Sequence, residues 1–104
     1  MQIEIRKLEV RLKEFVEAEQ KAIEALRKWL EKLKQLDDFV HRVSEKKDAW
    51  TTRQLLKLQV ESTQAFQEAL KEFSRSEHEK SHLLDSYGSI ISALEELDLK
   101  LLKP

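Results

Sequence analysis

The residues whose types and spacing could support chemistry are two histidines and a glutamate near residue 80. His78, Glu79 and His82 follow the pattern H-E-x-x-H. On a helix the two histidines stand at positions i and i+4 and face the same side, where they could share a zinc ion. The glutamate between them would then act on a water bound to the metal. Zinc-dependent hydrolysis is therefore the first function to weigh.

The surroundings of this motif argue against that chemistry. The pattern is similar to the motif of zinc metalloproteases, whose two central positions are normally uncharged and whose motif helix packs against a sheet. Here Lys80 is charged, and no stretch of the sequence reads as a strand. The carboxylates that could supply a third ligand are Glu95, Glu96 and Asp98. They lie about three to five turns further along the same helix, too far to reach. We expect two solvated histidines without a role, with adventitious binding of zinc or nickel as the alternative.

Other catalytic patterns are missing from the sequence. It contains no glycine-rich phosphate loop, no Ser, His and Asp constellation in a plausible cleft, and no carboxylates clustered on an apolar floor. We therefore expect no enzyme, no catalytic residue, no metal site and no cofactor.

The elements that carry these residues read as long helices. From Leu8 to Val43 a row of residues is separated by steps of four and three in strict alternation, and only Glu19 breaks its apolar character. The row consists of Leu8, Leu12, Phe15, Glu19, Ala22, Leu26, Trp29, Leu33, Leu36, Val40 and Val43. This is a heptad seam, which predicts a helix that packs against another helix.

Composition supports an all-α chain and restricts its partners. The 104 residues include one Gly and one Pro, and 38% are charged, which disfavours sheets and their turns. The net charge of -1 is spread evenly, so we expect no nucleic-acid partner. No apolar run reaches the roughly 18 residues of a membrane span, and Met1 to Arg11 does not read as a signal peptide. The absence of cysteine excludes disulfides and leaves the compartment open.

We expect a single domain, residues 1–104, forming an elongated antiparallel helical bundle. A polar stretch from Ser44 ends at Asp48, a good N-cap, and predicts a turn at 45–51. A phase shift within one continuous helix is the alternative. Ser74 to His82 has no large apolar side chain, and Ser76 has capping-box spacing to Glu79. These features favour three helices, roughly 2–46, 50–74 and 77–102, over a two-helix coiled-coil hairpin, which stays open.

The second half repeats the seam and contains one ambiguous glycine. After a broad apolar face at 55–73, a new seam contains Leu83, Tyr87, Ile90, Leu94, Leu97 and Leu101. Gly88 lies inside that seam and is either a helical residue or a C-cap.

Four further features carry specific expectations. We expect Trp29 to be a large core residue, whereas Trp50 either caps the end of the bundle or stands out as an anchor for a partner. Glu19 is expected to be solvated, or else to fix helix register. The proposed turn is mildly basic through His41, Arg42, Lys46, Lys47, Arg53 and Lys57. A solvated tip is the first interpretation of this charge, and a phosphate-binding tip is the second.

Three helical families resemble this pattern. Trp29, within Arg27-Lys28-Trp29-Leu30, resembles the tryptophan in the first helix of a spectrin-type repeat. The length, the lack of cysteine and the central Trp50 are similar to the secreted hairpins of the WXG100 type, although Thr51 and Thr52 follow where that family has Gly. The long amphipathic helices and basic tip resemble BAR domains. These resemblances imply helical hairpins or bundles, and no functional residue is carried over from them.

The function predicted from the sequence is structural. We expect a non-catalytic interaction module that packs helix on helix, with a membrane-surface (BAR-like) or secreted WXG100-like hairpin as the alternative. The residues expected to pack internally are Trp29, Leu33, Leu36, Phe66, Leu70, Leu94 and Leu97. The expected partner is another helical protein or a second copy, because slender helices leave apolar flanks that a copy could cover.

Overall fold

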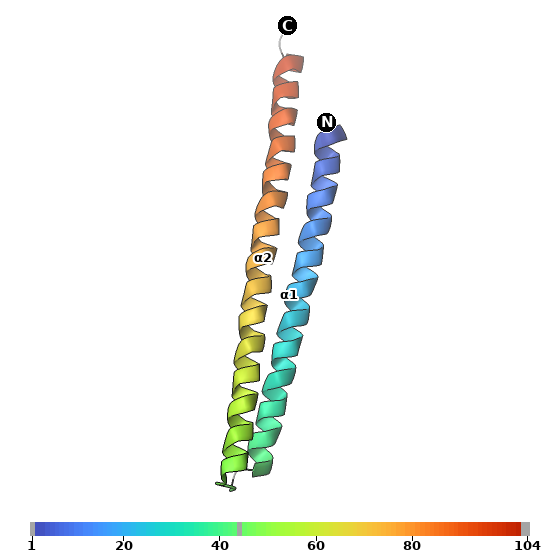
Figure 1. The fold of residues 1–104 in the computed structure, drawn as a ribbon. Coiled ribbons are helices and arrows are strands. Elements are labelled where there is room, and N and C mark those ends of the chain that lie inside the picture. Colours follow the sequence, from blue (N-terminus) through green and yellow to red (C-terminus); the bar gives the residue numbers. More distant parts are fainter. Residues whose placement is uncertain (1, 44, 103–104) are drawn as a thin grey trace.

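The chain forms a hairpin of two long antiparallel helices. The computed structural model describes residues 2–43 and 45–102, which form α1 (Gln2–Val43) and α2 (Ala49–Leu102) (Figure 1). The molecule measures 87 × 17 × 15 Å, and its radius of gyration is 23.8 Å, compared with about 13 Å for a compact chain of this length. The all-α class and the elongated antiparallel arrangement are confirmed.

The turn between the helices lies where the sequence placed it. Residues 45–48 connect the helices, and the amide of Lys46 donates to the carbonyl oxygen of Val43 at 2.9 Å. Asp48 is the N-cap of α2, because its Oδ1 accepts a hydrogen bond from the Thr51 amide at 2.7 Å. The first helix ends at Val43, three residues before the predicted end. Ser44, where the polar stretch begins, lies outside the described residues.

The predicted break near residue 75 is wrong. α2 is one continuous helix through Ser76 and Gly88, and neither that glycine nor any other described residue has a positive φ. The stretch without large apolar side chains does not end the helix, because Ser76 is itself buried in the interface with α1. Small polar side chains can fill an interface where two helices approach closely. The described part of the chain therefore has two helices in place of the favoured three.

The interior between α1 and α2 is narrow and built from small residues. Its most deeply buried side chains are alanines, Ala22 at 0% and Ala69 at 1% exposure. The interior positions of α1 are Leu8, Arg11, Phe15, Ala18, Ala22, Ala25, Trp29, Lys32, Leu36, Phe39 and Val43. Those of α2 are Thr51, Leu55, Leu58, Ser62, Ala65, Ala69, Glu72, Ser76, Glu79, Leu83, Ser86, Ile90 and Ala93. Both rows advance in alternating steps of three and four residues, the spacing of one face of a helix.

Only half of the seam expected on α1 faces α2. Leu12, Glu19 and Val40 are exposed, and the residues just before them in the sequence lie in the interior instead. Two of those preceding residues, Ala18 and Phe39, are buried. The same correction applies to residues of α2 that were expected to pack internally: Phe66, Leu70, Leu94 and Leu97 are all exposed.

The expected solvation of Glu19 is confirmed, although its cause differs. The carboxylate is exposed while α2 continues alongside, because the neighbouring alanines, not Glu19, face that helix. Within the described residues, neither helix has a stretch long and apolar enough to cross a membrane.

Candidate functional site

The histidine motif lies on the surface of α2 and contacts α1 through one ring. The His78 and His82 ring centroids are 4.3 Å apart, as expected for positions i and i+4. His82 Nδ1 lies 3.3 Å from the guanidinium Nη1 of Arg11 and 3.8 Å from Glu79 Oε2. A guanidinium can only donate, so in this contact Nδ1 is the acceptor. The ring therefore links the two helices.

This arrangement does not assemble a metal centre. No group of three or more His, Cys, Asp or Glu side chains in residues 2–43 and 45–102 is placed to hold a metal ion. Glu79 occupies an interior position, and its Oε2 is shielded from solvent without a hydrogen-bond partner. Arg11 of α1 lies against the motif, and its positive charge opposes binding of a second cation there.

The tip of the hairpin combines an exposed tryptophan with basic residues. Trp50 is 60% exposed, and its ring centroid lies 6.5 Å from that of Phe39. It thus contacts the buried Phe39 at the end of the interior and also stands out from the surface, while a role as an anchor for a partner stays a prediction. His41 Nδ1 lies 2.8 Å from the carbonyl oxygen of Asp37, and this hydrogen bond, with the nearby Asp37 carboxylate, raises the pKa of His41. Lys46 and Lys47 are exposed, and a phosphate-binding role for them stays a prediction.

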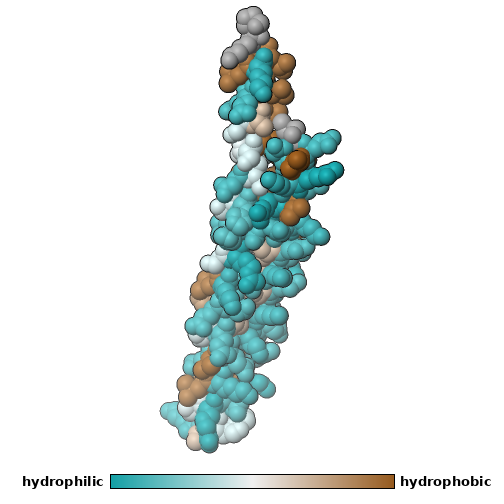
Figure 2. Space-filling model, turned by 45° about the horizontal axis from the view of Figure 1, so that its top comes forward, coloured by the Kyte–Doolittle hydropathy of each residue, from teal (hydrophilic) through white to brown (hydrophobic). Residues whose placement is uncertain are grey.

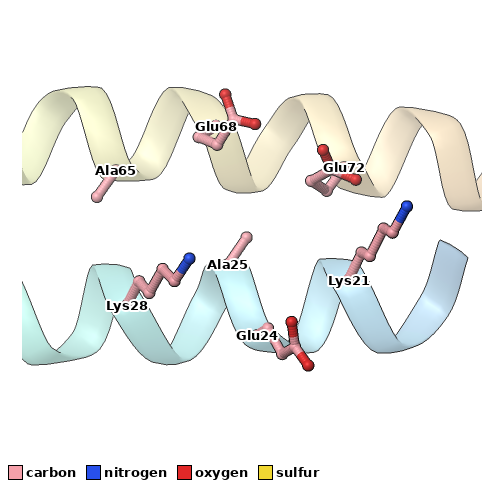
Figure 3. A pocket seen from close by; sticks show the side chains of 7 residues that line it. All are labelled: Lys21, Glu24, Ala25, Lys28, Ala65, Glu68 and Glu72. Atoms are coloured by element: carbon pink, nitrogen blue, oxygen red, sulfur yellow. The ribbon is translucent and has the colours of Figure 1, made fainter. Parts of the chain in front are cut away.

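One side of the hairpin is a polar groove. Figure 3 shows its lining, with Lys21 and Lys28 extending from α1 toward α2, and Glu68 and Glu72 on α2. The groove encloses about 210 Å³ and has two alanines at its floor, Ala25 and Ala65. Nearby, Lys32 Nζ lies 3.4 Å from Glu61 Oε2 and joins the two helices. The opposite charges face each other across an open space, which is typical of a solvated flank.

The register of the helices shows which rows share a side. We label the interior rows a and d, with Leu8 and Leu55 at position a. The polar groove then brings together the g rows, represented by Lys21, Lys28 and Glu68. On the opposite side, the ring centroids of Trp29 (position a) and Phe66 (position e) lie 5.1 Å apart. The e rows of both helices therefore line the side opposite to the groove.

That opposite side carries large hydrophobic residues from both helices, and we call it the apolar face. On α1 it consists of Ile5, Leu12, Val16, Ile23, Leu26, Leu30, Leu33 and Val40. On α2 it consists of Leu56, Phe66, Leu70, Phe73, Leu84, Tyr87 and Ile91. All of them are exposed except Leu26 and Leu33, which are partly buried. They occupy the e rows and the adjoining b rows, so they form one face and not scattered surface positions.

A polar band divides the apolar face into two patches. Glu19 on α1, and Glu77 and Lys80 on α2, lie between the level of the Trp29 and Phe66 rings and the level of the Arg11 contact with His82. The tip patch lies between this band and the turn, and the distal patch lies on its other side. Figure 2 shows a mostly hydrophilic face of the molecule, on which separate hydrophobic groups lie among hydrophilic ones and further hydrophobic residues gather toward the C-terminal end.

The broad apolar face predicted at 55–73 is divided between two sides of α2. Leu55, Leu58, Ala65 and Ala69 lie in the interior, whereas Leu56, Phe66, Leu70 and Phe73 lie on the apolar face. The spacing of alanine and serine was the signal that could have located the interior. Ala18, Ala22 and Ala25 follow one another in steps of four and three, and Ser62 and Ala69 are seven residues apart. Small residues at that spacing indicate the line of closest helix approach.

Comparison with known proteins gives this chain no relative to reason from. No family model, curated protein or solved structure matches it.

Proposed function

We propose that the protein is a non-catalytic interaction module that works by packing helices against its apolar face. The observation that carries this proposal is that α1 and α2 place many of their large hydrophobic residues on one outer side, while most of the deeply buried side chains between the helices are those of alanine and serine. Soluble monomers rarely expose contiguous apolar patches beyond a few hundred Å². A face of this size is explained if another helical surface covers it.

The shape of the face favours a helix as the binding element. Two ridges of side chains run along the e rows, one on each helix, and Phe66 in the α2 ridge contacts Trp29 at the edge of the interior. Such a pair of ridges accommodates a helix whose apolar residues recur at steps of three and four. Binding would need no chemical step, in keeping with a scaffold or coiled-coil role.

The test adds a synthetic amphipathic helix, as long as α1 and with leucine along one side, to the full chain. We expect saturable binding, measured by fluorescence anisotropy of a dye on the peptide. The double variant Leu30→Glu with Leu70→Glu, one substitution on each helix of the face, should weaken binding at least about tenfold, or roughly 1.4 kcal/mol. The control is Gln20→Glu with Gln64→Glu, which adds the same charge at exposed positions outside the face.

Equal binding to both double variants, or no binding to the unchanged chain at a concentration at which it is a single chain, would argue against this function. A zinc hydrolase is the rival from another class. It requires stoichiometric zinc that survives dialysis, together with peptide hydrolysis that Glu79→Gln abolishes. We expect neither activity nor retained zinc, and finding both would overturn the non-catalytic assignment.

A further inference from the structure

We propose that the partner covering the apolar face is a second copy of this chain, aligned with its tip at the same end, in a four-helix bundle. This inference rests on the proposed function and names its partner. In this arrangement the two hairpins stack face to face, related by a two-fold axis along their length. Each α1 then lies against the α2 of the other copy, and every neighbouring pair of helices is antiparallel.

The pattern of residues along the apolar face favours a second copy as the partner. Any partner must present two apolar patches separated by a polar band at the same spacing. A tip-aligned copy does so by construction, because the patches of α1 and α2 lie at the same levels. Leu30 of one copy lies at the level of Phe66 of the other, since Trp29 and Phe66 already share that level within one hairpin. Glu19 likewise lies within one helical turn of the level of Glu77, so polar residues lie near polar residues.

The opposite orientation fits less well. A two-fold axis across the polar band would place the tip patch over the distal patch of the other copy. The tip patch is the longer one on α1, reaching from Ile23 to Val40, whereas the distal patch there spans Ile5 to Val16. Val40 would then extend past the start of the other α1 and stay uncovered. That axis also brings each Glu77 near its own equivalent.

The area of the apolar face also favours a second copy. The fifteen residues of the apolar face are each roughly half exposed, so together they offer on the order of 1,000 Å², and one partner in a standard interface contributes about 800 Å². The hairpin alone leaves this surface in water and buries mainly small side chains, with Ala22 and Ala69 the deepest. A second copy supplies the large-residue core that one hairpin lacks.

The first test is molar mass by light scattering over roughly 1 to 100 μM, the range in which micromolar association is visible. We expect twice 12.3 kDa. A mass of one chain throughout, or assemblies larger than two, overturns the proposal. A one-chain mass combined with peptide binding at the face removes the second copy as partner and leaves the proposed function intact. A one-chain mass without peptide binding removes both.

The second test uses charge complementation. Leu30→Glu and Phe66→Lys should each reduce dimer formation at least about tenfold, and an equimolar mixture of the two should restore it, because residue 30 of one chain meets residue 66 of the other. The mixture is informative even if a single variant unfolds on its own, since helicity followed by circular dichroism should return on mixing. The control mixture pairs Leu30→Glu with Gln64→Lys, which lies outside the face. Equal rescue by both mixtures overturns the arrangement.

The third test fixes the orientation. The chain lacks cysteine, so Lys47→Cys introduces one thiol per chain at the exposed tip. Tip alignment brings the two thiols to the same end, and mild oxidation should convert most of the dimer to a disulfide-linked species. In the opposite orientation the tips lie at the two ends of the assembly. A dimer that does not cross-link through the introduced thiols contradicts tip alignment.

Discussion

Trp29 on α1 and Phe66 on α2 face each other with ring centroids 5.1 Å apart and planes tilted by 43°, at the edge where the narrow interior opens onto the apolar face. They are the large rings that bridge the two helices on that side. Both come from positions spaced for a helix interface, yet Phe66 is 40% exposed. Phe66 therefore packs against Trp29 within the hairpin and also contributes exposed surface that a partner would cover.

A double-mutant cycle on this pair should reveal direct coupling. Offset aromatic pairs are worth about 0.5 to 1.5 kcal/mol beyond the area they bury, so Trp29→Ala and Phe66→Ala should be non-additive by that amount. The measurement is the free energy of unfolding by urea for the four proteins of the cycle. The matched control repeats the cycle with Phe73→Ala in place of Phe66→Ala. Phe73 lies one heptad further along the same row. Coupling of Trp29 to Phe73 as strong as to Phe66 would contradict the register described here.

The buried alanines define the distance between the helices, and enlarging one should destabilise the hairpin. Ala22 has no exposed surface, so Ala22→Leu must push α1 away from α2 or force strained rotamers. Overpacking of this kind costs about 1 to 3 kcal/mol. The control Gln20→Leu adds a leucine at an exposed position two residues away and should change stability by less than about 0.5 kcal/mol. Urea unfolding monitored by circular dichroism measures both, and equal effects would show that Ala22 does not lie in the interior.

These residues also show how far sequence reasoning reaches. The long helices follow from the scarcity of Gly and Pro, and the turn follows from the capping preference of Asp48, both local properties of the chain. Which side of each helix faces the other depends on packing between the helices and not on the local sequence. A row of leucines and a row of alanines at the same spacing compete for the interface, and close approach of the two backbones favours the alanines. Phe66 was therefore assigned to the core although it lies largely on the surface.

The same reason explains the missed continuity of α2. Ser76 with Glu79 has the spacing of a capping box, and nothing in the local sequence distinguishes such a box from two interior positions of an unbroken helix. The distinction requires knowing that α1 presents small residues opposite: Ala18 is buried on α1, as Ser76 is on α2. Likewise, the placement of Arg11 beside His82 depends on the register of the hairpin, which motif spacing alone does not fix.

An interior carboxylate offers a route to higher stability. Glu72 occupies an interior position, its side chain is 13% exposed, and its Oε2 lacks a hydrogen-bond partner. Its contact with Arg75 is long, at 3.5 Å. Glu72→Leu should therefore raise the free energy of unfolding by about 1 kcal/mol, since replacing a poorly compensated buried ion with an apolar side chain is often stabilising. Thermal unfolding should show a higher midpoint for this variant.

The control for that prediction is Glu68→Leu. Glu68 lines the same groove but is exposed, so its replacement removes no buried charge and should leave the midpoint nearly unchanged. A lower midpoint for Glu72→Leu than for the unchanged protein would indicate that the carboxylate is well solvated or paired in the groove.

The N-cap of α2 should make stability depend on pH in the acid range. The hydrogen bond from the Thr51 amide lowers the pKa of Asp48, so the folded state favours the ionised carboxylate. A group whose pKa is depressed by folding stabilises the protein above its unfolded pKa, near about 4, and this contribution is lost as the pH falls from there through the lower folded value. Asp48→Asn keeps a capping oxygen but cannot ionise, so between about pH 5 and about pH 2 its unfolding free energy should fall less steeply than that of the unchanged protein.

Asp48→Ala should be less stable than both at neutral pH, where the cap is fully formed. Parallel urea titrations at each pH measure these differences, and identical pH profiles for the unchanged protein and Asp48→Asn would mean that the Thr51 amide does not distinguish the ionised carboxylate from a neutral oxygen.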